Sequence, residues 1–227
     1  MISVIIPTLN AAPRLAECLA ALVPAAADGL IVEVVIADAG SKDETLDIAE
    51  AMGASVVSSV KGRGPQLIAG ASQAKRGKWL LFLHADTVLE AGWEVATRSF
   101  VERHEANPKA ACFTLAYDSD SKKARRAERL IEWRCDTFGL PYGDQGLLIA
   151  RTHYDPIGGF APLPLMEDVD IIRRIGRRRI IILRSKAITS ADKYERDGWL
   201  KRSAKNIALV LAYFAGVKPE KLAQWYR

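Results

Sequence analysis

Residues 79–87 form the segment that most constrains how this chain folds. Five large apolar residues, 79–83, follow one another without helical spacing and end in His84, Ala85 and Asp86. Such a run is typical of a strand covered on both faces, as in α/β sheets. Open α/β sheets bind ligands beyond the carboxyl ends of their strands, so we expect Asp86 to face a ligand crevice. A carboxylate there suits Mg²⁺ or Mn²⁺ bound together with phosphates, unless Asp86 only caps the next helix.

Strands and helices alternate around this segment. Strands are predicted at 3–7, 31–37 and 54–60, with helices following from about 13, over 41–52 and over 66–76. The sequence Ser-x-x-Glu at 41–44 predicts a capping box at the start of the second helix. Three successive strand–helix units predict a parallel sheet with helical crossovers. Beyond the central segment the alternation is less regular. Strands are predicted at 111–117, 147–150 and 180–183, and helices from 93, over 122–138, from 167, and over 199–226 as one or two segments.

Length and composition predict one main domain. The 227 residues are 49% hydrophobic, enough for an α/β core with at most a small appendage. We therefore predict a main domain over 1–190 and a C-terminal helical extension over 191–227. Three widely spaced cysteines form neither a metal knuckle nor a disulfide framework, and no basic leader precedes the first strand, so a cytoplasmic protein is expected.

The net charge of +5 favours anionic partners such as nucleotides, phosphates and acidic lipids. Aromatic residues are not interleaved with the basic clusters, which disfavours a nucleic-acid partner. The apolar segment 207–217 is too short to span a bilayer. Two alternatives remain for it: peripheral contact with the inner face of a membrane, or burial in the fold or in a homodimer interface.

Three motifs occur in an order that resembles a known enzyme family: Val-Ile-Ile-Pro-Thr-Leu-Asn at 4–10, Asp-Ala-Gly-Ser-Lys-Asp-Glu-Thr at 38–45 and Leu-His-Ala-Asp-Thr at 83–87. With Gly-Asp-Gln-Gly at 143–146 and Met-Glu-Asp-Val-Asp at 166–170, they make the chain similar to family 2 glycosyltransferases over about residues 1–185. The resemblance implies the GT-A fold, a Rossmann-like α/β architecture with a mostly parallel central sheet flanked by helices. It also implies inverting, metal-dependent transfer of a sugar from a nucleotide-sugar donor, here expected to be a UDP-sugar, to a small or lipid-linked hydroxyl acceptor.

The resemblance assigns the nucleotide to the tips of the first two strands and to the central motif. The implied nucleotide-binding residues are Pro7, Thr8, Asn10, Asp38 and Ala85. The Asp38 carboxylate can accept a hydrogen bond from a base N–H. The alternative is that Asp38 only forms a turn.

Asp86 corresponds to the second carboxylate of the family's Asp-x-Asp metal motif, whereas His84 replaces the first. His84 could ligate Mn²⁺ or Mg²⁺, hydrogen-bond to a substrate oxygen or fill space, and its role stays open. The chain also lacks an arginine that many family members carry ahead of the central strand. Arg63, between two glycines, is either a substitute that binds phosphate or a solvated surface residue.

Inverting transfer needs one general base that takes the proton of the acceptor hydroxyl. The resemblance assigns this role to Asp168, with Glu167 alongside and Asp170 as the competing choice. Gly143, Asp144 and Gln145 are candidates for contacting the acceptor or the donor sugar. The alternative for these three residues is a turn without a ligand.

Two other functions remain as alternatives. A nucleotidyltransferase would share a nucleotide-binding sheet, but it usually needs a glycine-rich basic loop after the first strand, and residues 7–10 do not supply one. A non-catalytic nucleotide- or lipid-binding module is favoured if the replacement by His84 means that the metal site has decayed.

Overall fold

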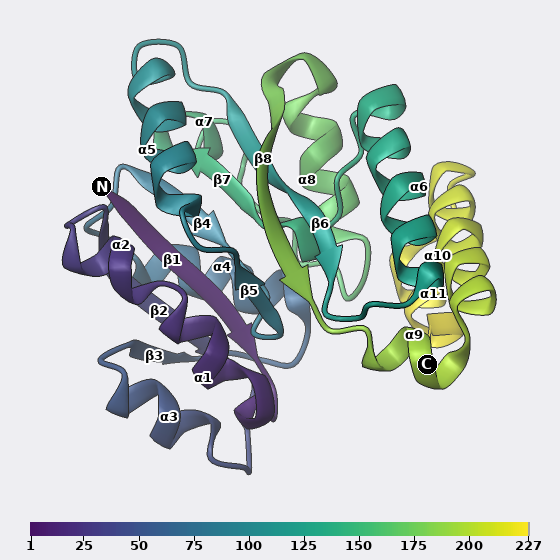
Figure 1. The fold of residues 1–227 in the computed structure, drawn as a ribbon, viewed down its shortest axis with the longest axis horizontal. Helices are drawn as coiled ribbons and strands as arrows, with labels where there is room; N and C mark the ends of the chain where they lie inside the picture. The colour runs from purple at the N-terminus through teal and green to yellow at the C-terminus, as the bar shows by residue number, and fades with distance from the viewer. Residues whose placement is uncertain (227) are drawn as a thin grey trace.

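The structure is a computed structural model that describes residues 1–226, and one eight-stranded sheet runs through them (Figure 1). The strand order is β3-β2-β1-β4-β7-β6-β8-β5. Strands β1 (Ile2–Thr8), β2 (Ile31–Asp38), β3 (Ser55–Ser58) and β4 (Trp79–Phe82) are parallel to one another, as the three strand–helix units predict. The remaining strands are β5 (Thr87–Leu89), β6 (Ala110–Tyr117), β7 (Leu147–Ala150) and β8 (Ile180–Thr189).

The directions of the strands bring most of their ends to one edge. Strand β7 is antiparallel to both β4 and β6, so β6 runs in the same direction as β4. Strand β8 is parallel to β6, and β5 is antiparallel to β8. Six strands therefore end at one edge of the sheet, and β5 and β7 begin there.

Two helical layers cover the sheet, because alternate residues of the central strands face opposite sides. Leu81 of β4 packs in one core with α1 (Ala12–Ala20), α2 (Val23–Ala27) and α5 (Trp93–Arg103). Leu80 and Phe82 pack in a second core with α4 (Arg63–Gln73), α7 (Arg151–Tyr154) and α8 (Glu167–Ile175). Strand β4 is thus buried on both faces, which confirms the prediction for residues 79–83.

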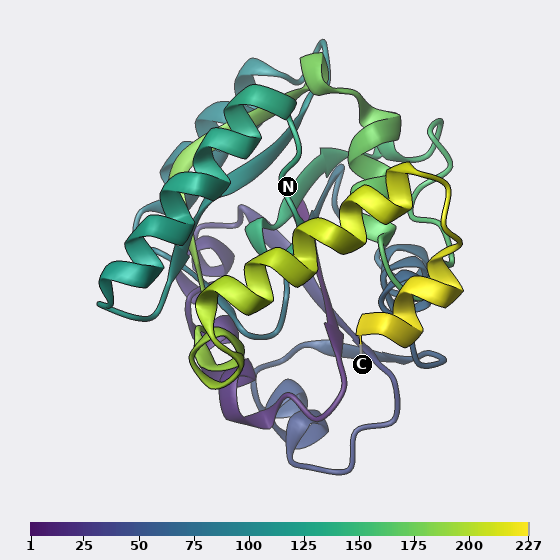
Figure 2. The ribbon, with the colours of Figure 1, turned by 90° about the vertical axis from the view of Figure 1, so that its right-hand side faces the viewer.

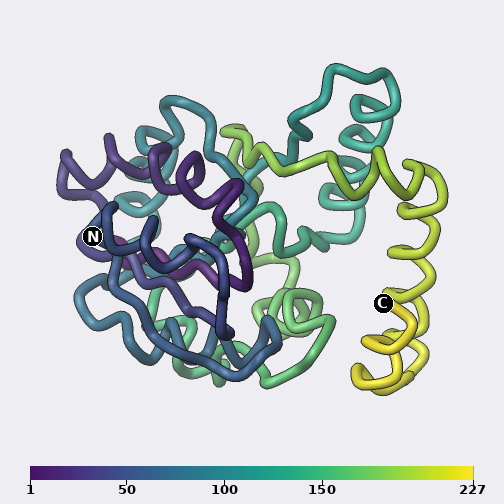
Figure 3. The backbone as a smooth tube through the Cα atoms, turned by 90° about the horizontal axis from the view of Figure 1, so that it is seen from below, coloured from purple at the N-terminus to yellow at the C-terminus, as the bar shows by residue number. Residues whose placement is uncertain are grey.

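The C-terminal helices lie apart from these two layers. Helix α9 (Asp192–Asp197) leads into α10 (Trp199–Phe214), which lies beside α6 (Lys122–Phe138), and α11 (Pro219–Tyr226) packs on the other side of α10 (Figures 1 and 2). Leu209 of α10 and Leu222 of α11 pack on Met166 and Val169 at the start of α8. Seen from below, helices α10 and α11 occupy the end of the molecule opposite the N-terminal strands (Figure 3). None of the helices in residues 1–226 has the length and apolarity needed to cross a membrane.

Some sequence-based expectations are wrong in detail. The capping box at 41–44 does not form: α3 (Thr45–Ala51) begins later, and the Ser41 hydroxyl donates to Asp38 instead. Helix α4 begins at Arg63 rather than at Gln66, and β8 extends to Thr189 rather than ending at Leu183. The short elements α2, β5, α7, α9, η1 (Gly143–Gln145) and η2 (Arg177–Arg179) were not predicted. Cys18, Cys112 and Cys135 are buried free thiols, as expected.

Candidate active site

The sheet edge where six strands end carries two adjoining cavities. The larger, of about 500 Å³, lies over the tips of β1 and β4 and is lined by Pro7, Thr8, Asn10 and Ala85. We call it the tip cavity. The smaller, of about 130 Å³, is lined by Asp144, Glu167 and Asp168, and we call it the acid cavity. Arg63, His84 and Asp86 line both cavities, so the two form one continuous cleft.

Asp38 lies beneath the tip cavity and is committed to the backbone around it. Its carboxylate accepts hydrogen bonds from the hydroxyls of Thr8 and Ser41 and from the backbone N–H groups of Gly40 and Ser41. Burial alone would raise the pKa of Asp38, but these hydrogen bonds lower it below its usual value, so the side chain is ionised. Both oxygens thus hold the turn after β2, as the turn-forming alternative expects, and contact of Asp38 with the nucleotide stays a prediction.

Asn10 and Gln66 join the same two strand tips. Asn10 has a positive φ of 52°, and its side-chain oxygen accepts a hydrogen bond from the backbone N–H of Lys42 at 2.9 Å. Buried Gln66 donates to the carbonyls of Thr8 and Ala37 at 2.7 and 2.8 Å. Hydrogen bonds between the two strand tips therefore hold the floor of the tip cavity in place without a ligand. Gln66 is a supporting residue that no sequence motif indicated.

His84 and Asp86 lie in the link between β4 and β5. Burial and the positive charge of Arg63 lower the pKa of His84 to about 4, so the imidazole is neutral at physiological pH. In the part of the chain that the structure describes, the Asp86 carboxylate has no side-chain hydrogen bond or ion pair. A neutral imidazole and an uncommitted carboxylate thus face one cleft.

Antiparallel pairing explains why the acidic turn meets this motif. Because β7 runs opposite to β4, the segment before β7 reaches the edge where β4 ends. The backbone N–H of Gly143 donates to the Asp168 carboxylate at 2.9 Å. A Cβ atom on Gly143 would lie 2.9 Å from Nε2 of His84, so a larger residue at this position would displace the imidazole.

Two further carboxyl groups of the acid cavity are buried. Glu167 is 2% exposed, and burial together with the nearby Asp168 carboxylate raises its pKa to about 7, although Arg63 opposes the shift. Burial raises the pKa of Asp144 to about 6. Within residues 1–226, one oxygen of each group has no hydrogen-bond partner, a cost that active sites commonly carry.

Arg63 is one of the cations that line both cavities of the cleft. It is the first residue of α4, and the following Gly64 packs closely against the backbone of Ala161 and Leu163. Burial would lower the pKa of its guanidinium, but the carboxylates of Glu167, Asp168 and Asp86 outweigh burial and raise it. Arg63 is half-buried and lines both cavities, which favours the phosphate-binding alternative over that of a solvated surface residue.

Two predicted site residues point elsewhere. Gln145 is 1% exposed, donates to the carbonyl of Phe113 at 2.9 Å and accepts from the backbone N–H of Tyr142 at 3.2 Å. It supports the turn and does not line either cavity, so its contact with a substrate stays a prediction that this placement does not favour. Asp170 pairs with Arg174 at 2.6 Å and also does not line the cleft.

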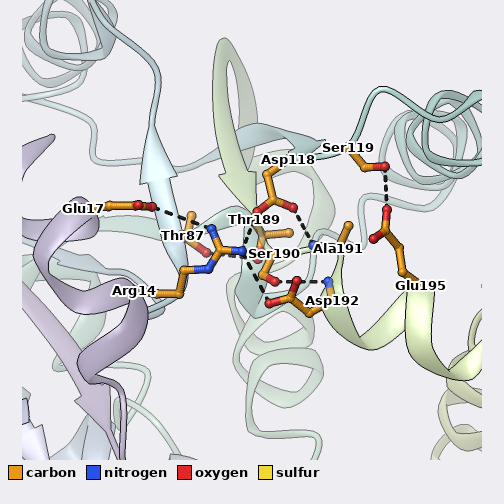
Figure 4. A network of polar contacts seen from close by, with 10 residues as sticks. All are labelled: Arg14, Glu17, Thr87, Asp118, Ser119, Thr189, Ser190, Ala191, Asp192 and Glu195. Carbon is orange, nitrogen blue, oxygen red and sulfur yellow. Dashed lines mark hydrogen bonds and ion pairs between the residues drawn. The ribbon is translucent and has the colours of Figure 1, made fainter.

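The C-terminal helices supply cleft residues that no sequence motif indicated. Lys193 of α9 and Tyr226 of α11 line both cavities. The start of α9 is held by Arg14 of α1, whose guanidinium lies 2.9 Å from Asp118 and 3.4 Å from Asp192 (Figure 4). These three residues, which we call the Arg14 clamp, connect α1, the end of β6 and α9 in space.

Comparison with known proteins agrees with the motifs. A family model described as Glycosyl transferase family 2 matches residues 3–163. PGL/p-HBAD biosynthesis glycosyltransferases of Mycobacterium tuberculosis and Mycobacterium bovis are 35% identical over 119 residues, which cover 46% of this chain and 43% of each relative. The chain thus spans less than half of the length of these curated relatives.

Solved structures share the fold. A crystal structure of glucosyl-3-phosphoglycerate synthase from Mycobacterium tuberculosis, in complex with Mn²⁺, UDP and glucosyl-3-phosphoglycerate, has a TM-score of 0.58 at 21% identity, covering 82% of this chain and 70% of that chain. Another structure of that enzyme, with Mn²⁺, UDP-glucose and phosphoglyceric acid, has a TM-score of 0.57 at 22% identity, with the same coverage. The predicted GT-A architecture is confirmed.

Proposed function

Because the chain belongs to glycosyl transferase family 2, we propose that it moves a sugar from a nucleoside-diphosphate sugar, with UDP as the nucleotide, to a hydroxyl acceptor. The continuous cleft is the observation that supports this activity most strongly. It joins strand tips suited to a nucleotide with a cluster of buried acids suited to proton removal, and a charged arginine lies between them. A purely binding module would have no need for the acids.

The donor nucleotide would occupy the tip cavity, with its diphosphate directed towards Arg63. Backbone and side chains of Pro7, Thr8, Asn10 and Ala85 line the walls. A guanidinium matches phosphate oxygens in a bidentate manner, so Arg63 suits the diphosphate. The structural neighbours described above bind UDP or UDP-glucose, which supports the choice of nucleotide.

The residues present fit a divalent cation that is shared with the substrate. Residues 1–226 contain no group of three ligating side chains that could enclose a metal alone. Mn²⁺ and Mg²⁺ at nucleotide sites, however, take one or two protein ligands and complete their shell with phosphates and water. Asp86 would hold the cation with neutral His84 as the second ligand, and the cation would neutralise charge on the leaving diphosphate.

The acceptor hydroxyl would enter the acid cavity next to Asp168. As the acceptor oxygen attacks the anomeric carbon, its proton passes to the Asp168 carboxylate, and the bond to the nucleoside diphosphate breaks on the opposite face, which inverts the anomeric configuration. The backbone N–H of Gly143 fixes the orientation of Asp168, and Arg63 stabilises the departing charge. Glu167 lies alongside and modulates the local charge.

The division at residue 190, cytoplasmic location, peripheral membrane contact and homodimer formation stay predictions.

Binding of UDP tests the donor and metal assignments together. Asp86→Asn keeps the shape of the side chain but removes the charge that holds the cation, so titration calorimetry should show UDP affinity that no longer rises on adding Mn²⁺. The matched control is Asp47→Asn on the exposed face of α3, which should keep the wild-type response. Equal Mn²⁺ dependence in the wild type and in Asp86→Asn would overturn the metal assignment.

A further inference from the structure

A third cavity, of about 460 Å³, lies between α6 and α10. We call it the helix groove. Its walls include large apolar side chains that are 46–64% exposed, namely Leu130, Trp133, Phe138, Ile207, Leu211 and Phe214. Single exposed apolar residues are normal on a protein surface, but a contiguous apolar patch commonly marks a binding site.

The groove arises because two amphipathic helices turn their apolar faces towards a shared space instead of packing together. On α6, residues 127, 130, 131, 133, 134 and 138 line the groove, and on α10 residues 203, 206, 207, 210, 211 and 214 do so. Both sets follow helical spacing, so each is one continuous face. The apolar run in α10 that the sequence singled out therefore forms one wall of a cavity.

The inner end of the helix groove adjoins the acid cavity. Tyr142, Asp144, Tyr194 and Asn206 line both cavities. A buried oxygen of Asp144 has no hydrogen-bond partner in residues 1–226, and it lies where the two cavities meet. Apolar walls with a few polar groups at one end are the usual composition of a small-molecule site of this volume.

We propose that the helix groove holds the hydrocarbon chain of an amphiphilic acceptor whose uncharged hydroxyl head lies in the acid cavity. That this amphiphile is the sugar acceptor rests on the proposed function, whereas binding of its hydrocarbon chain in the groove does not. The wall that the groove shares with the acid cavity favours this occupant over a second protein molecule, which would cover the mouth and leave the inner end empty. The inner end offers hydroxyl, amide and carboxyl groups to the head. Of the described residues that line the helix groove, Arg134 has the one guanidinium, which stacks 3.5 Å over the Tyr142 ring and donates to the carbonyl of Leu140. In the acid cavity, the Arg202 guanidinium is paired with Asp197 at 2.7 Å, and Arg63 is assigned above to the diphosphate.

Binding of n-alkyl β-glucosides tests the groove directly. Methyl, butyl, hexyl and octyl glucosides would be titrated below their micelle concentrations by calorimetry, and UDP would be titrated separately. We expect affinity to rise by about threefold for each methylene that becomes buried. Binding of the octyl compound should also shift the tryptophan fluorescence, and this shift should be absent in Trp133→Phe.

Matched variants on one helix locate the site. Leu211→Gln places an amide in the groove wall and should lower octyl glucoside affinity by about fivefold or more. Leu200→Gln lies on the same helix but outside the groove and is 89% exposed, so it should bind as the wild type does. Because Leu211 is itself 64% exposed, its replacement should not unfold the protein, and a thermal melt checks this.

The outcomes separate this inference from the proposed function. If the protein binds UDP but its affinity for the glucosides does not depend on the length of their alkyl chain, the inference about the groove alone would be overturned. If glucoside affinity rises with the length of the alkyl chain but UDP does not bind, the proposed function would be overturned and the hydrocarbon site in the groove would still be supported. A dimer in sedimentation experiments that Leu211→Gln dissociates, with no alkyl binding by the wild type, would show that a second copy covers the groove and would also overturn the inference.

Discussion

Glu167 carries a proton in the folded protein at pH values where an exposed glutamate has lost it. Its pKa of about 7 lies above the ordinary value near 4.5, so between these values the unfolded chain binds fewer protons than the native protein. The free energy of unfolding therefore falls as pH rises through this window. Glu167→Gln mimics the protonated form and should relieve the loss.

We compare the free energy of unfolding of Glu167→Gln with that of the wild type at two pH values. The difference in favour of the variant should be larger at pH 8 than at pH 5 by more than about 1 kcal/mol. Urea unfolding at both pH values, without nucleotide or divalent cation, measures the difference. Glu50→Gln on exposed α3 serves as the control and should show no such change. An equal effect of Glu167→Gln at both pH values would mean that the carboxyl is ionised in the native state.

Asp168 should affect catalysis and not donor binding. Asp168→Asn is expected to keep affinity for UDP and Mn²⁺ but to lower sugar transfer by about 10²-fold or more, the scale usual for removing a general base. Asp170→Asn is the neighbouring control, because Asp170 pairs with Arg174 away from the cleft. Loss of transfer in Asp170→Asn or Asp144→Asn, with retention in Asp168→Asn, would reassign the base. Single-turnover assays with an established acceptor measure this.

At the level of residues, the sequence predicts which residues lie at the cleft better than it predicts the role of each of these residues. His84, Asp86 and Asp168 were predictable because they lie at element ends, where α/β sheets bind ligands. The hydrogen bond from the Thr8 hydroxyl to Asp38 and the bond from buried Gln145 to the Phe113 carbonyl were not predictable, since each joins residues about 30 positions apart in the sequence. Lys193 and Tyr226 carry no motif, and only the path of the C-terminal helices brings them to the cleft.

At the level of elements, the Arg14 clamp determines where α9 lies. Arg14→Met keeps most of the apolar stem but removes both ion pairs, so hydrogen exchange over residues 191–197 should become faster while β1 and β4 stay protected. The cost to global stability should be about 1 kcal/mol or less, because the pairs are partly exposed. Glu17→Gln is the control, since Glu17 contacts the same guanidinium at 3.7 Å but is not part of the clamp. Unchanged exchange in Arg14→Met would mean that packing alone positions α9.

Elements with a long periodic pattern were predictable, and elements fixed by distant partners were not. The bounds of α6 and β7 follow directly from local pattern. The capping box at 41–44 failed because the Ser41 hydroxyl is used by Asp38 and by the backbone of Asn10. Strand β5 has three residues and exists only through its pairing with β8, about a hundred positions later in the chain.

For the whole molecule, Leu222 fixes α11 to the rest of the fold, since it is 0% exposed and packs with Met166 and Val169 at the start of α8. Leu222→Ala should cost about 2–4 kcal/mol at that site, through lost burial and the cavity left behind. Limited proteolysis should then cleave near residues 216–218 well before the sheet unfolds, whereas Leu200→Ala at the exposed position should behave as wild type. Cleavage of Leu222→Ala at the wild-type rate would show that other contacts hold α11.

The link between β4 and β5 has a consequence for the order of folding. β4 can form with β1 and β2 as soon as the first 82 residues are present, but β5 must wait for β8. His84 and Asp86 lie in the four residues between these strands. Contacts between residues far apart in sequence form late, because loop closure must come first. The central motif should therefore acquire its native geometry among the last steps of folding, so a nascent chain with a complete parallel half would still lack a working centre.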